Sequence, residues 1–440
     1  MTYLEAKKIL DANGQGQILA FWNKLDAKAR KALLAQVAGI DFKELARCKA
    51  MLPGMSDGTA DAMNCVPPGA ASPTAPKVAE LKGKALASAF AAGAKELAAG
   101  RVAVLLVAGG QGSRLGFDGP KGAYSIGPIT NKPLFHFHAR KVLGKARKYG
   151  KAVPFYIMTS EANYDATVAC FKENGWFGLD RKDVFFFKQG MWPGMTADGK
   201  VILDAPGHVF MSPDGHGGLL AALKRSGALA DMKKRGVRSV FFFQVDNPLV
   251  EVADEAFIGY HVLEKSEYTL KLCAKRDPYE KVGMPMKFGN VFKMVEYTEM
   301  TDEQCNRKGK DGRLYFLYGS PAIHVFDRAF LEREAMKPMP LHLAHEKIAQ
   351  VDASGKVVKP TEPNGYKFEK FIFDVLPDAK KAAFLAFDQK DEFSPVKNAD
   401  GSDSPATCKA DLQAKWRRQL AERGILIEGD ATIEIDPAAF

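Results

Sequence analysis

The chain has 440 residues, 46% of them hydrophobic, which allows one large core with one or two small satellite domains. The formal net charge is +10, but no Lys/Arg-dense tract with interleaved aromatic residues stands out. This argues against nucleic-acid binding and favours attraction of anionic small molecules. The six cysteines form no Cys-x-x-Cys pair, which argues against a zinc site and suits a cytoplasmic protein with reduced thiols. No apolar run reaches membrane-spanning length, so we expect no membrane association.

Apolar residues recur at helical spacing near the start of the chain. This spacing extends from Ile18 to Val37 and predicts one amphipathic helix over residues 16–38. The next helix has a candidate N-cap in Asp41, and Glu44, three residues later, would complete a capping box.

A connection rich in Pro, Gly, Ala and Ser is predicted over residues 52–78. A helical pattern then covers residues 79–98. We therefore expect residues 1–98 to form an N-terminal helical segment.

Strand and helix patterns alternate through the middle of the chain. They predict an α/β domain over residues 99–385, with a central, mostly parallel mixed sheet and flanking helices. Residues 284–330 predict shorter strands, as a mixed or antiparallel extension. Strand-like alternation over residues 424–436 predicts a small C-terminal β-containing domain at 386–440. The expected strands are 102–108, 155–159, 184–188 and 239–245, and the expected helices are 133–149, 164–174 and 218–225.

The most informative stretch is VAVLLVAGGQGSRLGFDGPKG, residues 102–122. An apolar run of strand length ends in a glycine loop, which places backbone N–H groups at a sheet edge where they can hold phosphate oxygens. Glycine permits the close approach and the positive φ that such turns require. Arg114 and Lys121 add positive charge. We expect a polyphosphate site; the alternative is a glycine-rich turn without a ligand.

Two better-known phosphate loops do not fit. A P-loop has Gly directly followed by Lys and then Ser or Thr, whereas here Pro120 precedes Lys121 and Gly122 follows it. The dinucleotide fingerprint needs an acidic residue about 20 positions after its glycines. Between Asp118 and Glu161 there is no acidic residue but eight Lys or Arg, so a strongly anionic ligand is favoured over a nicotinamide cofactor.

A candidate metal ligand follows the apolar run 239–245. Asp246 lies at the carboxyl end of this expected strand, where open α/β sheets bind ligands. A single carboxylate suits Mg²⁺, which takes one or two carboxylates together with phosphate oxygens. The alternative is that Asp246 caps the following turn.

GGQGSRLG followed by PKG resembles the nucleotide loop of UTP-dependent sugar-1-phosphate uridylyltransferases, and more specifically of eukaryotic-type UDP-N-acetylglucosamine pyrophosphorylases. The resemblance implies a Rossmann-like nucleotidyltransferase fold. It continues in order along most of the chain, through residues 17–45, 185–195, 211–223, 244–261, 282–300, 359–374 and 391–401.

The resemblance also implies roles for individual residues. Lys370 could share a helix face with Lys367, and Lys397 is a weaker phosphate candidate. His342 and His345 have no third ligand at metal spacing, so we interpret them as structural. The implied assignments are Arg114, Lys121 and Lys367 as catalytic cations, Asp246 as metal ligand, Ala108, Gly109, Gly110, Gln189 and Gly215 as nucleotide-binding, and His216, Gly283, Glu296 and Ser320 as sugar-binding.

The implied reaction is attack of a sugar-1-phosphate oxygen on the α-phosphorus of UTP, with Mg²⁺ as cofactor and pyrophosphate as leaving group. Two sugar-side positions depart from the N-acetylhexosamine enzymes, since His216 and Ser320 stand where those enzymes have Asn. We favour N-acetylglucosamine-1-phosphate as substrate, with glucose-1-phosphate or a broad sugar range as alternatives. A nucleotide-sugar sensor without turnover is a further alternative. We expect a monomer or weak homo-oligomer.

Overall fold

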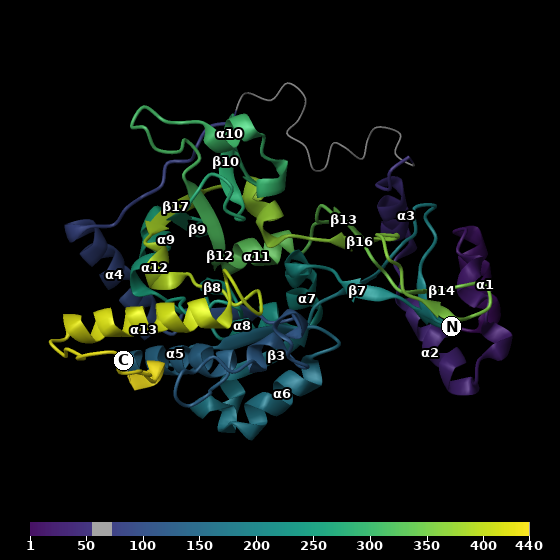
Figure 1. The fold of residues 1–440 in the computed structure, drawn as a ribbon, viewed down its shortest axis with the longest axis horizontal. Helices are drawn as coiled ribbons and strands as arrows, with labels where there is room; N and C mark the ends of the chain where they lie inside the picture. Colours follow the sequence, from purple (N-terminus) through teal and green to yellow (C-terminus); the bar gives the residue numbers. More distant parts are fainter. Residues whose placement is uncertain (55–72, 440) are drawn as a thin grey trace. The chain divides into compact units, whose positions relative to one another are not determined.

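The computed structural model describes residues 1–54 and 73–439, which form two compact units (Figure 1). The smaller unit comprises Met1–Ala70, Gln189–Leu219 and Pro338–Ile372, and the larger comprises Ala71–Lys188, Leu220–Lys337 and Phe373–Phe440. The sequence predicts three consecutive domains, at residues 1–98, 99–385 and 386–440, which divide the chain differently. These domain boundaries stay a prediction. Most of the connection predicted at 52–78, including Cys65, lies outside the described residues.

A seven-stranded sheet, in the order β17-β9-β12-β8-β1-β2-β3, forms the centre of the larger unit. β12 pairs antiparallel with β8 and β9, and all other neighbours are parallel, which confirms the predicted mixed, mostly parallel sheet. Its strands are β1 (Val102–Val107), β2 (Phe155–Thr159), β3 (Val184–Lys188), β8 (Ser239–Gln244), β9 (Tyr268–Ala274), β12 (Tyr318–Asp327) and β17 (Ala382–Phe387). β1 and β8 are apolar and almost wholly buried, as central strands covered on both faces should be.

Helices flank this sheet and pack closely. At Gly93 of α4 a Cβ would lie 1.9 Å from the Glu255 carbonyl oxygen, and at Gly259 of α9 it would lie 1.7 Å from that of Ala89, so glycine is what lets the two helices touch. The helices of this unit are α4 (Gly83–Ala98), α5 (Leu134–Tyr149), α6 (Tyr164–Glu173), α8 (Ala228–Lys234), α9 (Glu255–Glu264), α10 (Asp302–Asn306), α11 (Arg328–Glu334), α12 (Gln389–Glu392) and α13 (Pro405–Glu422), and α7 (Leu219–Arg225) begins at the boundary between the units.

Two predictions for the larger unit need correction. The hairpin of β10 (Met284–Phe288) and β11 (Val291–Val295) is the expected antiparallel extension, but β12 lies inside the central sheet. The predicted helix at 79–98 begins only at Gly83, because Ala79 pairs with β17 through hydrogen bonds to Phe384 and Ala386.

The C-terminal β-containing domain was a wrong prediction for the described residues. This region is dominated by α13, which Ser404 caps and which buries Cys408, Leu412 and Trp416 along one face. Residues 424–436 have turns and no regular structure, and they form no ladder among the described residues, since the Gln413 side chain bonds the Ile433 backbone instead.

In its described residues the smaller unit combines three α-helices with short two-stranded ladders around a core that includes Ile18, Leu33 and Phe368. Its elements are α1 (Tyr3–Ala12), α2 (Ala27–Gly39), α3 (Phe42–Ala50) and the pairs β4 (Met191–Pro193) with β7 (Met211–Pro213), β5 (Leu203–Ala205) with β6 (His208–Val209), β13 (His342–Glu346) with β16 (Gly365–Glu369), and β14 (Gln350–Val351) with β15 (Val357–Val358).

The single helix predicted at 16–38 is broken into two short 3₁₀ turns and α2. The break occurs because Leu25 is extended and the Asp26 side chain caps α2 at the Ala29 amide. Asp41 does cap α3, but the reciprocal capping box was wrong, since Glu44 pairs with Arg47 instead. In the described part of the chain, no helix combines the length and apolar character needed to cross a membrane.

Candidate active site

The glycine loop leaves the carboxyl end of β1 and folds back on itself. The Gly112 amide donates to the Gly119 carbonyl (2.9 Å), and the Lys121 amide donates to the Gly110 carbonyl (3.1 Å). Asn163 holds the loop from the side, since its Nδ2 donates to the carbonyls of Ala108 (3.0 Å) and Gly110 (3.2 Å). At Gly112 a Cβ would lie 2.7 Å from the Phe117 ring, so the tight turn requires glycine.

The outer side of this loop keeps its donors and charges available. Among the described residues, the amides of Gly109, Gly110 and Gln111 donate no hydrogen bond. Arg114 is exposed and Lys121 is half-buried, and neither side chain forms an ion pair or hydrogen bond with another described residue. Three available amides beside two unpaired cations suit a phosphate-bearing ligand.

Asp246 lies beside this loop because β8 and β1 are parallel neighbours. Val107 pairs with Gln244, and the Val245 amide donates to the Val107 carbonyl (3.1 Å), so both strands end at the same sheet edge. The half-buried Asp246 carboxylate forms no hydrogen bond or ion pair in the described part of the chain. The cap of the following turn is Asn247, whose Oδ1 accepts from the Leu249 amide, so the turn-cap alternative for Asp246 was wrong.

This carboxylate fits Mg²⁺ as a partial ligand. The described residues contain no group of three or more His, Cys, Asp or Glu side chains able to hold a metal alone. Mg²⁺ in nucleotide sites is held by one or two carboxylates and completes its shell with phosphate oxygens and water. An unpaired carboxylate next to available loop amides is therefore suited to metal bound together with a nucleotide.

Three predicted sugar-side residues lie together elsewhere in the larger unit. The Ser320 amide donates to the Gly283 carbonyl (2.8 Å), and a Cβ on Gly283 would lie 3.0 Å from Glu296 Oε1. Glu296 also begins the short turn that follows, since its amide donates to Glu299 Oε2 (2.8 Å) and its carbonyl accepts from the Glu299 amide (2.9 Å). The Glu296 backbone therefore has a local structural role whatever the side chain binds.

A pocket of about 780 Å³ extends from the glycine loop toward this group. Arg114, Lys281 and Lys397 line it without ion pairs among the described residues, whereas Arg276 pairs with Glu280 (2.7 Å). Val282 and Tyr297, the neighbours of Gly283 and Glu296, also line it. Arg276 and Lys281 were missed by sequence reasoning, because they lie in no recognisable motif; only the charged run RDPYEK could have drawn attention to them.

The smaller unit contains the turn at 214–218, which is joined to residues 369–372. The Gly217 amide donates to the Lys370 carbonyl (2.7 Å), and the Lys370 amide donates to the Asp214 carbonyl (2.9 Å). Gly215 has φ +77°, and a Cβ there would lie 2.5 Å from the Lys370 carbonyl oxygen. Glycine at 215 is therefore required by the fold of this turn.

His216 is integrated into the same structure. Its Nδ1 accepts a hydrogen bond from the Ile372 amide (3.0 Å), and its ring stacks on Phe371 with centroids 5.3 Å apart. Burial and the nearby His342 lower its pKa to about 4, so the ring is neutral at pH 7.

Gln189 adjoins this turn through Gly190, whose carbonyl accepts from the Asp214 amide (3.1 Å). Only 8% of Gln189 is exposed, and its side-chain amide bonds no other described residue. A buried amide with both a donor and an acceptor available is suited to the edge of a nucleobase.

Lys367 lies in β16, so the predicted helix face shared with Lys370 was wrong. β16 ends at Glu369 and Lys370 follows directly after it, so neither lysine lies in a helix. Lys367 forms an exposed pair with Glu346 (3.3 Å), and the Lys370 ammonium lies 5.7 Å from the Trp192 ring centroid. His345 stacks on Tyr366 and His342 packs on Phe371, in agreement with structural roles for both histidines.

The structure thus brings the predicted residues together in three groups. Two of them belong to the larger unit and are linked by the pocket. The groups are Ala108, Gly109, Gly110, Arg114, Lys121 and Asp246 at the sheet edge, Gly283, Glu296 and Ser320 near the hairpin, and Gln189, Gly215, His216 and Lys367 in the smaller unit.

Comparison with known proteins gives consistent results. The family described as UTP–glucose-1-phosphate uridylyltransferase matches residues 72–403. The chain is 38% identical to UDP-N-acetylhexosamine pyrophosphorylase-like protein 1 of Mus musculus over 96% of this chain and 86% of the relative. It is 33% identical to UDP-N-acetylglucosamine pyrophosphorylase of Saccharomyces cerevisiae over 98% and 94%.

A solved structure is similar over most of the chain. The uridine diphosphate N-acetylglucosamine pyrophosphorylase from Trypanosoma brucei, solved in complex with an inhibitor, superposes with a TM-score of 0.81 at 28% identity, covering 94% of this chain and 84% of that one. From the family match, these relatives and the sheet-edge geometry, we conclude that the chain belongs to the UDP-sugar pyrophosphorylase family of nucleotidyltransferases.

Proposed function

We propose that this protein is a uridylyltransferase that converts UTP and N-acetylglucosamine-1-phosphate to UDP-N-acetylglucosamine and pyrophosphate. The observation that carries the proposal is the sheet edge, where three available loop amides, two unpaired cations and the unpaired Asp246 carboxylate lie together. The yeast and trypanosomal relatives are both named as N-acetylglucosamine enzymes, which supports this choice of sugar.

In the proposed reaction a phosphate oxygen of the sugar-1-phosphate attacks the α-phosphorus of UTP in line and expels pyrophosphate. The attacking oxygen is already an anion, so no general base is needed, and catalysis consists of positioning and charge neutralisation. The amides of Gly109 and Gly110 would bind nucleotide phosphate oxygens. Arg114 and Lys121 would neutralise the triphosphate and the departing pyrophosphate, and the pocket behind Arg114 offers room for those groups.

We also propose Mg²⁺ as cofactor, held by Asp246. When bound, the ion would neutralise phosphate charge beside the loop. Asp246 would fix it from the protein side, and the nucleotide would complete its shell. The roles that family resemblance gives to Gln189, Gly215, His216 and Lys367 stay predictions.

Glucose-1-phosphate is the second candidate sugar, and a specific observation favours it. His216 is a rigid ring, stacked on Phe371 and bonded to the Ile372 amide, where N-acetylhexosamine enzymes have Asn. If His216 admits glucose, His216→Asn should raise the ratio of kcat/KM for the N-acetylated sugar over glucose by about tenfold, or ~1.4 kcal/mol of differential transition-state binding.

Pyrophosphate release from UTP, measured with a panel of sugar-1-phosphates and Mg²⁺, tests the proposal. We expect turnover with the N-acetylglucosamine compound at the highest kcat/KM. A hundredfold preference for glucose-1-phosphate would select the second candidate. Binding of UDP-sugar without turnover of any sugar phosphate would indicate a sensor instead.

We further propose a cytoplasmic protein that is a monomer or weak homo-oligomer. The five cysteines in the described residues are free thiols, which suits a reducing compartment. Cell fractionation tests the cytoplasmic location, and sedimentation of the purified protein measures the oligomeric state.

A further inference from the structure

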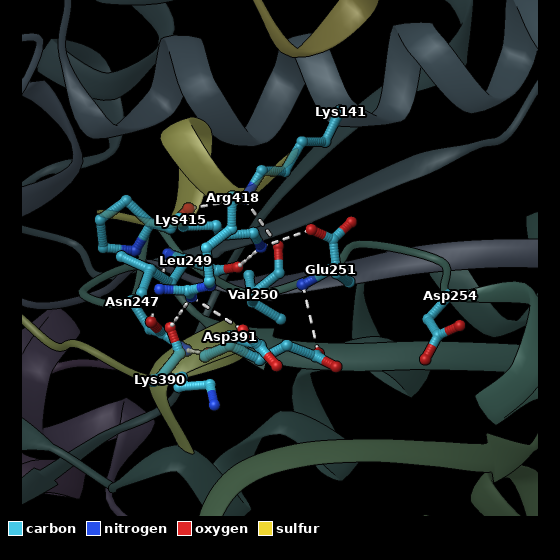
Figure 2. Close-up of polar contacts among 12 residues, drawn as sticks. Lys141, Asn247, Leu249, Val250, Glu251, Asp254, Lys390, Asp391, Lys415 and Arg418 are labelled. Atoms are coloured by element: carbon cyan, nitrogen blue, oxygen red, sulfur yellow. Dashed lines mark hydrogen bonds and ion pairs between the residues drawn. The ribbon is translucent and has the colours of Figure 1, made fainter. Parts of the chain in front are cut away.

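The turn after Asp246 has no regular structure, so its backbone carbonyls need donors from outside. It extends from Asp246 to Glu251, within the larger unit. Figure 2 labels Asn247 and Leu249–Glu251 of this turn together with side chains from α5, α12 and α13. Their hydrogen bonds determine where this turn, and therefore Asp246, can lie.

Two lysines, the half-buried Lys141 and the buried Lys415, supply most of these donors. Lys141 Nζ on α5 donates to the carbonyls of Pro248 (2.5 Å) and Val250 (2.6 Å), and Lys415 Nζ on α13 donates to the Leu249 carbonyl (2.8 Å) (Figure 2). Lysine Nζ atoms from two helices thus hold three consecutive carbonyls, and these hydrogen bonds are strongest when the lysines are protonated.

The beginning of the turn is held in the same way. His138 on α5, one turn before Lys141, bonds the Val245 carbonyl through Nε2 (2.9 Å). The Val396 amide donates to the Asp246 carbonyl (2.8 Å), and Asn247 Nδ2 donates to the Glu392 carbonyl (2.7 Å). The backbone on both sides of Asp246 is therefore fixed, while its carboxylate stays unpaired.

Lys141 differs from the two buried lysines nearest to this turn, Lys271 and Lys415, in its partners. Lys415 pairs with Glu251, and Lys271 pairs with Asp254 and Glu392, whereas both hydrogen bonds of Lys141 go to carbonyls of the turn. Burial and the neighbouring Lys415 lower the pKa of Lys141 to about 7, so the fold places a charge here at a cost. Replacing buried charges with apolar groups is often neutral or stabilising, so stability alone does not account for this lysine.

We infer that Lys141 is a positioning residue, which places the Asp246 carboxylate for metal–nucleotide binding by holding the Pro248 and Val250 carbonyls. This inference rests on the proposed role of Asp246. It assigns Lys141 no contact with substrate. Its effect should therefore be seen in metal affinity and turnover, with nucleotide affinity in the absence of metal unchanged.

The test compares Lys141→Met with Lys145→Met. Lys145 lies one helical turn further along α5 and pairs with Glu255 on α9. Mn²⁺ binding in the presence of UTP is measured by electron paramagnetic resonance, with pyrophosphate release and thermal unfolding alongside. We expect Lys141→Met to weaken Mn²⁺ binding at least fivefold and turnover at least tenfold, with metal-free UTP affinity within twofold of the parent. Lys145→Met should lower the melting temperature without weakening Mn²⁺ binding.

Other results would overturn the inference. If Lys141→Met lowers the melting temperature but leaves Mn²⁺ binding as in the parent, Lys141 is only structural. If Lys141→Met does not fold, Lys141→Gln, which keeps a donor on a shorter side chain, should still weaken Mn²⁺ binding at least twofold relative to Lys145→Gln. Equal Mn²⁺ binding in these two glutamine variants would contradict the inference. A parent that releases no pyrophosphate and binds no Mn²⁺ with UTP would instead refute the proposed function and, with it, the basis of this inference.

Discussion

The sheet edge of the larger unit and the 214–218 turn of the smaller unit use their polar groups in opposite ways. At the sheet edge, Arg114, Lys121 and the Asp246 carboxylate have no partner among the described residues. In the turn, His216 accepts from Ile372, and Gly215 fits only without a Cβ. Groups kept unpaired should affect activity without affecting stability, whereas groups already paired should affect both.

Asp246→Asn should have the largest effect on activity. The amide keeps the shape but loses the charge that would hold Mg²⁺, so we expect about a 1000-fold loss of kcat/KM, or ~4 kcal/mol, and a higher Mg²⁺ requirement. The free energy of unfolding should change by less than about 0.5 kcal/mol, because the carboxylate has no described partner to lose. An unchanged Mg²⁺ titration would contradict the metal role.

Lys121→Ala should have the next largest effect on activity. A cation acting on the developing phosphate charge is worth about 2–4 kcal/mol, so turnover should fall roughly 30- to 1000-fold. Denaturant unfolding of the variant should match the parent, since Lys121 forms no ion pair among the described residues. A turnover rate within tenfold of the parent's would show that Lys121 has no catalytic role.

Gly218→Ala tests the other side of the comparison. The new Cβ would lie 2.0 Å from Asp214 Oδ1, so we expect the free energy of unfolding to drop by about 2 kcal/mol through overpacking. Gly39→Ala is the matched control in the same unit, because nothing lies within 4 Å of its Cβ position. Equal melting temperatures for the two variants would show that the turn is not tightly constrained.

His216→Asn should lower the free energy of unfolding by less than Gly218→Ala does, about 1 kcal/mol at pH 7, because the hydrogen bond from Ile372 is altered. The neutral ring accepts from Ile372, and its folded pKa of about 4 lies below the unfolded value near 6.5. The unfolded chain therefore binds the proton more readily, so this stabilisation is present above pH 6.5 and is lost as the pH falls toward 4. Unfolding measured between pH 4 and 7 should show a smaller decline in the variant, and an identical decline would argue against a buried neutral His216.

The sequence predicted the sheet edge well because its determinants are local. The continuous apolar runs of β1 and β8, each followed by Gly or Asp, require only that parallel neighbours end together. Arg276 and Lys281 could not be predicted, because they reach the pocket through tertiary packing without any motif.

The errors at the two ends of the chain have a similar cause. Residues 424–436 alternate as a strand would, but a side chain, Gln413, takes the Ile433 backbone groups that a neighbouring strand would have used. Near the start, the helical spacing was real, but the Asp26 cap divided it. The periodicity of apolar residues predicts which face of a segment is buried, but it does not predict which groups its backbone will bond.

The central claim is that the sheet edge transfers the uridylyl group. ³¹P nuclear magnetic resonance of the parent protein with UTP, N-acetylglucosamine-1-phosphate and Mg²⁺ tests it most directly. The account predicts that UDP-sugar and pyrophosphate signals grow in equal amounts, and that both vanish in Asp246→Asn and decline steeply in Lys121→Ala. Binding of UTP without new phosphorus signals with any sugar-1-phosphate, or unchanged turnover in both variants, would contradict it.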